Sequence, residues 1–355
     1  MKWLKFLLFT FGLFSMTTLD QALARSGQKP GPNRPNLREV ASTNDRSAQN
    51  ETTKNDPDLK LAAEYDKQYK WSQMVVLLAP KLNTLDRQGL ILLAKAYGGL
   101  ADSVNRIRVL ELASSKAKND YYILTLLGDA MVENKQFDKA LDTYKQVLEI
   151  NSKYEPAFVG VFNAYNDSGN KYEARNAVGD LIKRFGKKPV YLSHLCRIFS
   201  IDDFLKKTVE TCEEATTLDK KNEMNYIYLS QAYINMKMPE KGLAALEKAL
   251  KHFPKSSPVA LALGQYYWEQ KDFVQSKKYF RQAVVVDEKS TEALIGYANS
   301  CFELHLLNEA LESFVRACKI NGSLSRELRA AYVKLRAQKD EKWVQKYEQG
   351  MNRCL

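Results

Sequence analysis

Apolar positions along this chain recur at helical spacing, and the same pattern returns every 34 residues. Within one period, two stretches carry apolar residues three or four positions apart, which is the spacing of one helix face. Each period therefore predicts a pair of antiparallel helices. Repetition of such a pair predicts an all-α solenoid, because each pair buries its apolar face against the next one.

Seven consecutive blocks fit this pattern without an insertion. They begin at Arg87, Tyr121, Glu155, Pro189, Glu223, Ser257 and Thr291. The first helix of each block has a large residue at its seventh position, namely Leu93, Leu127, Val161, Leu195, Leu229, Leu263 and Tyr297. The eighth position is Ala, Gly or Ser in five blocks, and the seven residues are Ala94, Gly128, Phe162, Cys196, Ser230, Gly264 and Ala298. A small residue there lets two helices approach closely.

The second helix of each block repeats a small position and a large one. The twentieth position is small at Ala140, Ala174, Gly242, Ser276 and Ala310. The twenty-fourth holds Leu110, Tyr144, Val178, Cys212, Leu246, Phe280 and Phe314. This arrangement resembles the tetratricopeptide repeat. The resemblance implies a right-handed superhelix of antiparallel helix pairs, whose first helices line a concave groove.

Both ends of the repeat array have weaker versions of the pattern. Residues 57–86 form a degenerate opening repeat, with apolar positions such as Leu61, Trp71 and Leu78. The seven repeats occupy 87–324. Residues 325–355 are expected to form capping helices with a polar outer face, as terminal repeats require for solubility.

The N-terminus reads as an export signal. Two lysines precede a short apolar run, and the small residues around Ala24 offer a cleavage site. We expect residues 1–24 to be a signal peptide cleaved after Ala24, which places the chain in the periplasm or outside the cell. An uncleaved signal anchor is the alternative. Residues 25–56 are rich in Pro, Gly, Asn and Ser with few aliphatics, which predicts a disordered linker.

The formal net charge is +11, and most of it stays on the repeats. Such an excess favours an acidic partner, such as a nucleic acid or an anionic membrane surface. The lysines and arginines are interleaved with acidic residues, however, as on any solvated helix face. Because no nucleic-acid-binding motif accompanies them, we expect no nucleic-acid partner. Association with a membrane-bound assembly is possible through a partner protein.

Five cysteines raise the question of disulfides. Cys196 and Cys212 occupy the eighth and twenty-fourth positions of one block, which face each other in a helical hairpin, so a disulfide between them is sterically reasonable. The alternative is two buried thiols. Cys301 and Cys318 do not face each other, and we expect both to be buried thiols.

Motifs for catalysis, metals and cofactors are missing from the sequence. It has three scattered histidines, no Cys-x-x-Cys pair and no Gly-rich phosphate loop. We therefore expect no enzyme activity, no cofactor, no metal site and no small-molecule substrate. The favoured function is a protein-interaction scaffold, an adaptor for envelope or secretion machinery. The alternatives are a periplasmic assembly chaperone and a regulatory subunit of a cell-wall enzyme.

The resemblance also locates a binding groove. In the family, the fifth, ninth and twelfth residues of the first helix point into the groove. In the last three repeats these residues are Ile227, Gln231, Ile234, Leu261, Gln265, Trp268, Ile295, Asn299 and Phe302. Side-chain amides can pair with a peptide backbone, and the apolar residues beside them offer pockets. We predict that a mostly apolar peptide binds across residues 224–303, with Trp268 and Phe302 as anchors. The alternative is that some of the apolar residues belong to the core.

Overall fold

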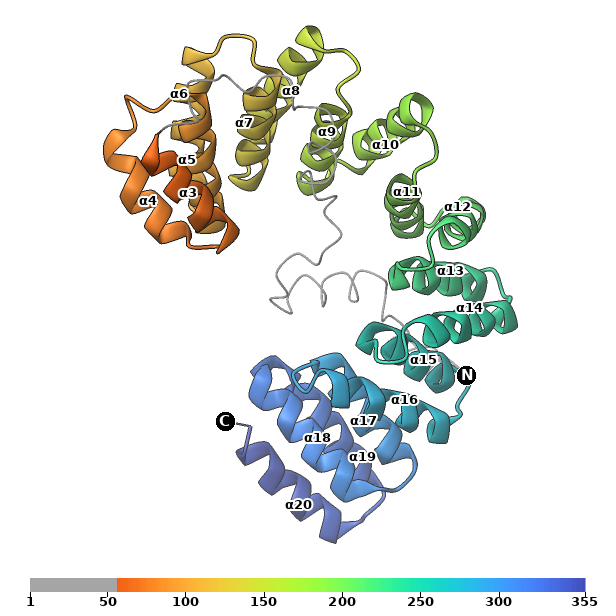
Figure 1. Cartoon of the computed structure of the whole chain (residues 1–355). Helices are drawn as coiled ribbons and strands as arrows, with labels where there is room; N and C mark the ends of the chain where they lie inside the picture. Colours follow the sequence, from red (N-terminus) through yellow and green to blue (C-terminus); the bar gives the residue numbers. More distant parts are fainter. Residues whose placement is uncertain (1–55, 355) are drawn as a thin grey trace. The chain divides into compact units, whose positions relative to one another are not determined.

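The computed structural model describes residues 56–354, and in that part of the chain it contains α-helices and short 3-10 turns but no strand. Figure 1 shows the helix order. The α-helices are α3 Pro57–Lys67, α4 Trp71–Leu78, α5 Arg87–Gly99, α6 Ser103–Lys116, α7 Tyr121–Glu133, α8 Phe137–Ile150, α9 Glu155–Asp167, α10 Lys171–Phe185, α11 Pro189–Ile201, α12 Leu205–Leu218, α13 Glu223–Asn235, α14 Pro239–His252, α15 Ser257–Glu269, α16 Phe273–Val286, α17 Thr291–Glu303, α18 Leu307–Ile320, α19 Ser325–Ala337 and α20 Glu341–Asn352. The fold is the all-α solenoid of antiparallel helix pairs that the sequence predicts.

The described chain divides into two compact units. We call residues 56–191 the N-terminal unit and residues 192–354 the C-terminal unit, with the boundary inside α11. The predicted signal peptide lies outside the described residues, as does the predicted linker apart from Asp56. That aspartate caps α3, because its carboxylate accepts a hydrogen bond from the backbone N–H of Asp58 at 2.8 Å. Among residues 56–354, no helix has both the length and the apolar character to cross a membrane.

Helix starts follow the 34-residue period. The first helix of each block, from α5 to α17, begins at the first residue of that block, and its partner begins sixteen residues later. The turn between the two helices contains one residue with positive φ in each block. These residues are Ala101, Lys135, Gly169, Asp203, Lys237, Lys271 and His305. Lys339 repeats this conformation between α19 and α20, so the terminal pair continues the same turn geometry.

Pairs of glycines explain the close helix contacts. In the N-terminal unit, a Cβ added at Gly128 or Gly160 would lie 2.6 or 2.3 Å from the ring of Tyr144. In the C-terminal unit, Gly264 and Gly296 hold Phe280 in the same way, at 2.8 and 2.5 Å. Tyr144 and Phe280 both belong to second helices. The ring of each fills a slot between the first helix of the same repeat and the first helix of the next repeat. We call this arrangement the ring slot.

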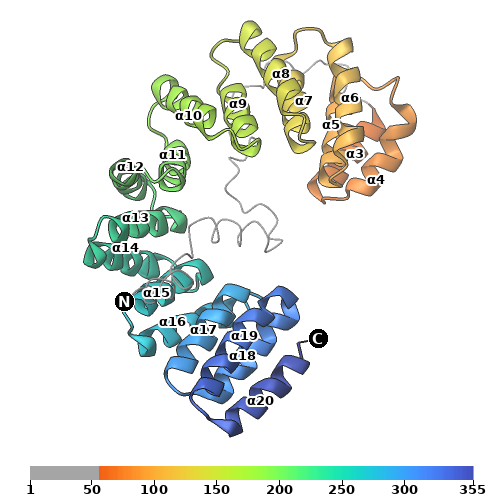
Figure 2. The same cartoon turned by 180° about the vertical axis from the view of Figure 1, so that it is seen from behind.

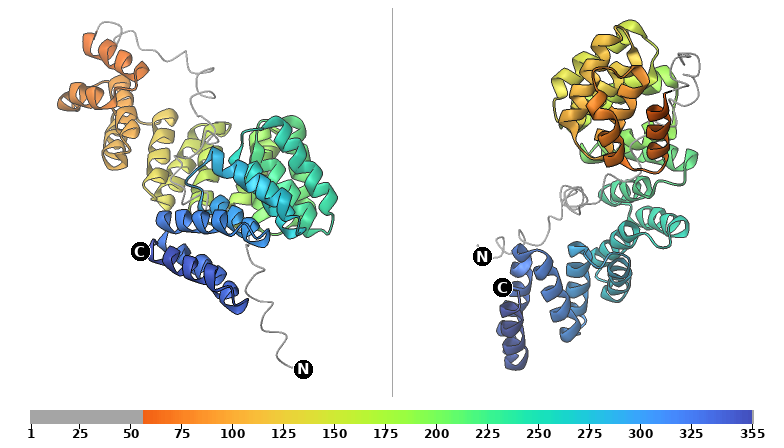
Figure 3. Two further views of the ribbon diagram at one scale, coloured as in Figure 1. Left: turned by 90° about the horizontal axis from the view of Figure 1, so that it is seen from below. Right: turned by 60° about the vertical axis from the view of Figure 1, so that its left-hand side comes forward.

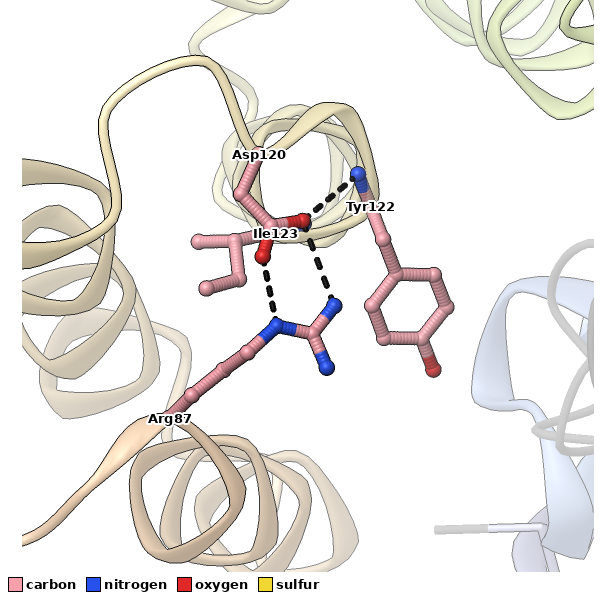
Figure 4. A network of polar contacts seen from close by, with 4 residues as sticks. All are labelled: Arg87, Asp120, Tyr122 and Ile123. Atoms are coloured by element: carbon pink, nitrogen blue, oxygen red, sulfur yellow. Dashed lines mark hydrogen bonds and ion pairs between the residues drawn. The ribbon is translucent and has the colours of Figure 1, made fainter. Parts of the chain in front are cut away.

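Polar contacts join neighbouring repeats at the N-terminal ends of their first helices. Figure 4 shows Arg87, at the start of α5, directed toward Asp120, which caps α7. The guanidinium Nε lies 2.5 Å from Asp120 Oδ2, while Oδ1 accepts the backbone N–H groups of Tyr122 and Ile123. One carboxylate therefore both starts a helix and binds the previous repeat.

The C-terminal unit ends in the pair α19 and α20. Figures 2 and 3 show this pair, in dark blue, following α18. Tyr347 is fully buried, and its hydroxyl donates to the carbonyl of Leu307 at 3.1 Å. A Cβ at Gly350 would lie 2.5 Å from Leu311 Cδ1. The last helix is therefore packed tightly onto α18 and continues the core.

Candidate functional site

The predicted peptide site lies on α13, α15 and α17, and all of it belongs to the C-terminal unit. Each helix is started by a side-chain cap, from Asn222, Ser256 and Ser290 respectively. Because the three helices begin at the same place in their repeats, their fifth, ninth and twelfth residues occupy equivalent positions. We call the surface formed by these positions the A-helix face.

Three of the nine predicted groove residues are in the core instead. Ile227, Ile295 and Phe302 are only 5, 7 and 9% exposed. Ile227 packs in one cluster with Val259 and Leu263 of α15, the next first helix. Ile227 therefore faces the neighbouring repeat, which covers it, while Phe302, at the twelfth position, packs against Tyr347 of α20 with ring centroids 6.3 Å apart. The sequence-based assignment of these three residues to an open groove needs this correction.

The other six residues are partly accessible. The ninth positions, Gln231, Gln265 and Asn299, place one side-chain amide in each of three successive repeats. Gln231 Nε2 donates to Asn235 Oδ1 at 3.0 Å, one turn along the same helix. Leu261 and Ile234 lie beside the amides and are also half-buried. The A-helix face therefore presents amides flanked by aliphatic side chains.

Trp268 lies between surface and core. Its ring is half-buried and packs against Phe273, the first residue of α16, with centroids 5.1 Å apart. This contact fixes the orientation of the indole while leaving part of it accessible. Trp268 thus retains the exposure that a binding anchor needs.

Phe302 forms the wall of a cavity. The cavity has a volume of about 350 Å³ and is lined by Phe302, Glu303, His305, Leu307, Lys334, Leu335 and Gln338. Lys334 Nζ lies 3.3 Å from Glu303 Oε1 and 5.5 Å from the centroid of the Phe302 ring. The second predicted anchor is therefore reached from within this cavity and does not protrude from the face.

Two disulfides cross-link helices within the C-terminal unit. Cys196 of α11 is bonded to Cys212 of α12, and both are fully buried. Cys301 is a buried free thiol whose pKa is raised to about 11, chiefly by burial. The expectation that Cys318 is also a thiol is wrong, because it is bonded to Cys354. Packing of α20 on α18 brings these two cysteines together, which the position of Cys318 within its own repeat does not reveal.

One histidine among the described residues has a strongly shifted pKa. Burial, together with the charge of Arg197, lowers the pKa of His194 to about 4, so this imidazole is neutral at pH 7. Across residues 56–354, no group of three His, Cys, Asp or Glu side chains is arranged to hold a metal ion.

Comparisons with known proteins agree with the repeat pattern. Family models described as "Tetratricopeptide repeat" match residues 121–154, 226–256 and 258–290. No curated protein matches the chain.

Solved structures share the fold at low sequence identity. A tetratricopeptide repeat protein from Parabacteroides merdae superposes with a TM-score of 0.53 at 13% identity, covering 69% of this chain and 98% of its own. The C-terminal part of a repeat protein from Cytophaga hutchinsonii gives 0.52 at 15% identity, covering 64% and 94%. The Pseudomonas aeruginosa pilF protein gives 0.51 at 14%, covering 59% and 96%. Repeats of this kind act as scaffolds for protein or peptide partners. The chain therefore contains tetratricopeptide repeats at the matched residues, and its helix-pair fold is the one found in solved tetratricopeptide repeat proteins.

Proposed function

We propose that the protein is an exported, non-catalytic adaptor that binds a mostly apolar peptide segment of envelope or secretion machinery on its A-helix face. The observation that carries this proposal is the row of three side-chain amides, from Gln231, Gln265 and Asn299, one in each of three successive repeats. An amide both donates and accepts hydrogen bonds, so three amides at repeat spacing suit the backbone of a long segment. Ile234, Leu261 and Trp268 provide apolar contacts beside it.

The cavity beside Phe302 is expected to accept one side chain of the bound peptide. Its lining residues follow Asn299 in the chain, and they combine the apolar Phe302, Leu307 and Leu335 with the polar Glu303, His305, Lys334 and Gln338. A peptide side chain that carries both apolar and polar atoms fits such a mixed lining. We expect that side chain to follow the stretch bound by the amides.

Two disulfides support the proposed location outside the cytoplasm. Disulfides persist in oxidising compartments, such as the bacterial periplasm or the cell exterior, and are rare in the cytosol. The bonds Cys196–Cys212 and Cys318–Cys354 are therefore consistent with the signal peptide expected at residues 1–24. Fractionation of the host with detection of the mature N-terminus tests the location, and a cytosolic full-length chain would contradict it.

Site-directed crosslinking in the native host tests the peptide face. A photoreactive amino acid is placed at Gln265 in one variant and at the exposed Lys248 of α14 in the control. We expect one defined adduct from position 265, identifiable by mass spectrometry, and none from position 248. Adducts from position 248 alone would contradict the proposed face.

The lifetime of the complex separates an adaptor from an assembly chaperone. An adaptor co-purifies with its partner at a fixed ratio after gentle lysis. A chaperone suppresses aggregation of its client without a lasting complex, and that result would contradict the adaptor role while leaving the binding face intact.

A further inference from the structure

The N-terminal unit has one continuous edge formed by the connections between repeats. These connections, with their adjoining helix ends, are residues 82–87, 116–121, 150–155 and 183–188, and we call them the connection edge. Neighbouring connections touch each other directly. Lys116 Nζ donates to the carbonyls of Asn83 and Leu85 at 2.7 and 3.1 Å, and the rings of Tyr121 and Tyr154 lie 4.8 Å apart.

The last connection joins the same edge. Lys188 Nζ lies 2.6 Å from Glu155 Oε1, and the ring of Phe185 lies 5.5 Å from that of Phe158. The four connections therefore form one surface along the N-terminal unit.

This edge is strongly basic. Its four segments contain eight basic and three acidic residues. The turns between the two helices of each repeat, taken as residues 66–71, 98–103, 132–137 and 166–171, form the turn edge. Those segments, which have the same length, contain four basic and four acidic residues. The connection edge therefore carries an excess of positive charge that the turn edge lacks, and most of it lies in residues 183–188, which hold four basic and no acidic residues.

The acidic residues of the connection edge are already engaged. Asp120 pairs with Arg87, and Glu155 pairs with Lys188. Asp86 caps α5 by accepting the backbone N–H of Gly89 at 2.8 Å. By contrast, Lys118, Lys153, Lys183 and Arg184 have exposed side chains and remain as the outward charge of the edge.

We propose that the connection edge binds the surface of an anionic lipid bilayer. Lys118 and Lys153 lie in two successive connections, and Lys183 and Arg184 lie in the last turn of α10, beside the next connection. A broad anionic surface meets cations spread along an edge in this way, whereas a peptide would need a groove. Ile150, 41% exposed, adds an aliphatic side chain among them. Each basic residue held near an anionic bilayer strengthens binding by roughly fivefold.

The aromatic rings argue against a nucleic acid at this edge. Sequence-tolerant binding of single strands needs open ring faces on which bases stack. Here Tyr121 and Tyr154 pack on each other, and Phe158 is covered by Phe185 and by the Arg184 guanidinium, 4.8 Å from its ring centroid. The edge therefore offers charge without stacking platforms.

Vesicle co-sedimentation of the full chain tests the proposal. The edge variant carries Lys118→Glu, Lys153→Glu and Lys183→Glu. The control variant carries Lys70→Glu, Lys135→Glu and Lys171→Glu on the turn edge, which changes the net charge equally. Residues 1–55 are identical in all three proteins, so any affinity of that segment for lipid is common to them. Circular dichroism checks that each variant is folded, and Lys→Gln versions at the same positions provide milder substitutions.

We expect the unmodified chain to bind phosphatidylglycerol vesicles, and to bind them less as salt increases. The edge variant should lose affinity by roughly a hundredfold, while the control variant loses far less. Equal losses in the two variants, or no binding that depends on the edge, would overturn the proposal. Tighter edge-dependent binding to single-stranded DNA or to polyglutamate than to vesicles would overturn it as well.

Discussion

The two units share one repeat architecture but are held together differently. The N-terminal unit contains no cysteine and no histidine. Its neighbouring repeats are joined by ion pairs such as Arg87–Asp120 and Arg106–Glu133. The C-terminal unit contains all five cysteines, two disulfides and every histidine of the chain. The same fold is therefore expected to respond to redox conditions and to mild acid in one unit only.

The ring slot is where the units agree. Tyr144 and Phe280 both lie between two glycines contributed by successive first helices. The two side chains differ in the phenolic hydroxyl, which Tyr144 has and Phe280 lacks. The Tyr144 hydroxyl donates to Asp129 Oδ1 at 2.7 Å, and burial, with the nearby Asp129 carboxylate, raises its pKa well above the usual value. The acceptor for the tyrosine hydroxyl is thus supplied by the first helix of the same repeat, at the residue that follows Gly128.

The largest expected effect comes from emptying the slots. Tyr144→Ala and Phe280→Ala should each lower the free energy of unfolding by about 3–5 kcal/mol, because each leaves a cavity between two first helices. Hydrogen exchange followed by mass spectrometry assigns each loss to a unit. We expect Tyr144→Ala to open the N-terminal unit and Phe280→Ala the C-terminal unit. Loss of protection in both units from one substitution would show that they do not unfold separately.

Removal of the disulfides should lower the stability of the C-terminal unit and leave that of the N-terminal unit unchanged. Cys196→Ser with Cys212→Ser opens a loop with a sequence separation of 16, and Cys318→Ser with Cys354→Ser opens one of 36. The expected losses are about 3 and 4 kcal/mol, because each bond restricts the unfolded chain. Denaturation with and without reductant measures the effect. The N-terminal unit is the internal control, and equal destabilisation of both units would contradict the comparison.

Trp268 and Phe302 test the division between surface and core inside the C-terminal unit. Trp268→Ala should weaken binding of the crosslinked partner by about 2 kcal/mol, or thirtyfold, with little loss of stability. Phe302→Ala is the matched variant, and we expect it to lower stability by about 3 kcal/mol because its ring is buried. Isothermal titration and thermal denaturation measure the two effects. A Trp268→Ala protein that binds normally but unfolds easily would place the indole in the core.

The smallest effect is a pH dependence of the C-terminal unit. His194 has a folded pKa of about 4 against an ordinary value of 6.5. As pH falls below 6.5, the unfolded chain binds a proton that the folded chain does not, so stability is highest above pH 6.5 and declines between pH 6.5 and 4. Between pH 7 and 5.5 the loss should be about 1–2 kcal/mol. Chemical denaturation at the two pH values measures it, and His194→Gln should remove the difference.

Much of this molecule follows from the sequence alone. The period, the start of each helix pair and the alternation of small and large positions depend on residues that are close in sequence or one repeat apart. Such contacts recur in most of the repeats, so a linear pattern records them. The slot residues Gly128 and Tyr144 are visible in this way as a small eighth and a large twenty-fourth position.

Only the tertiary structure shows the features that depend on contacts between repeats. The bond between Cys318 and Cys354 depends on how the terminal pair folds back onto α18, and nothing within one period encodes that approach. The burial of Ile227 and Ile295 depends on how closely the next first helix lies against them. The basic connection edge appears only when connections 34 residues apart are brought into contact. A repeating sequence determines its local unit, whereas exposure and pairing between units are set by packing in three dimensions.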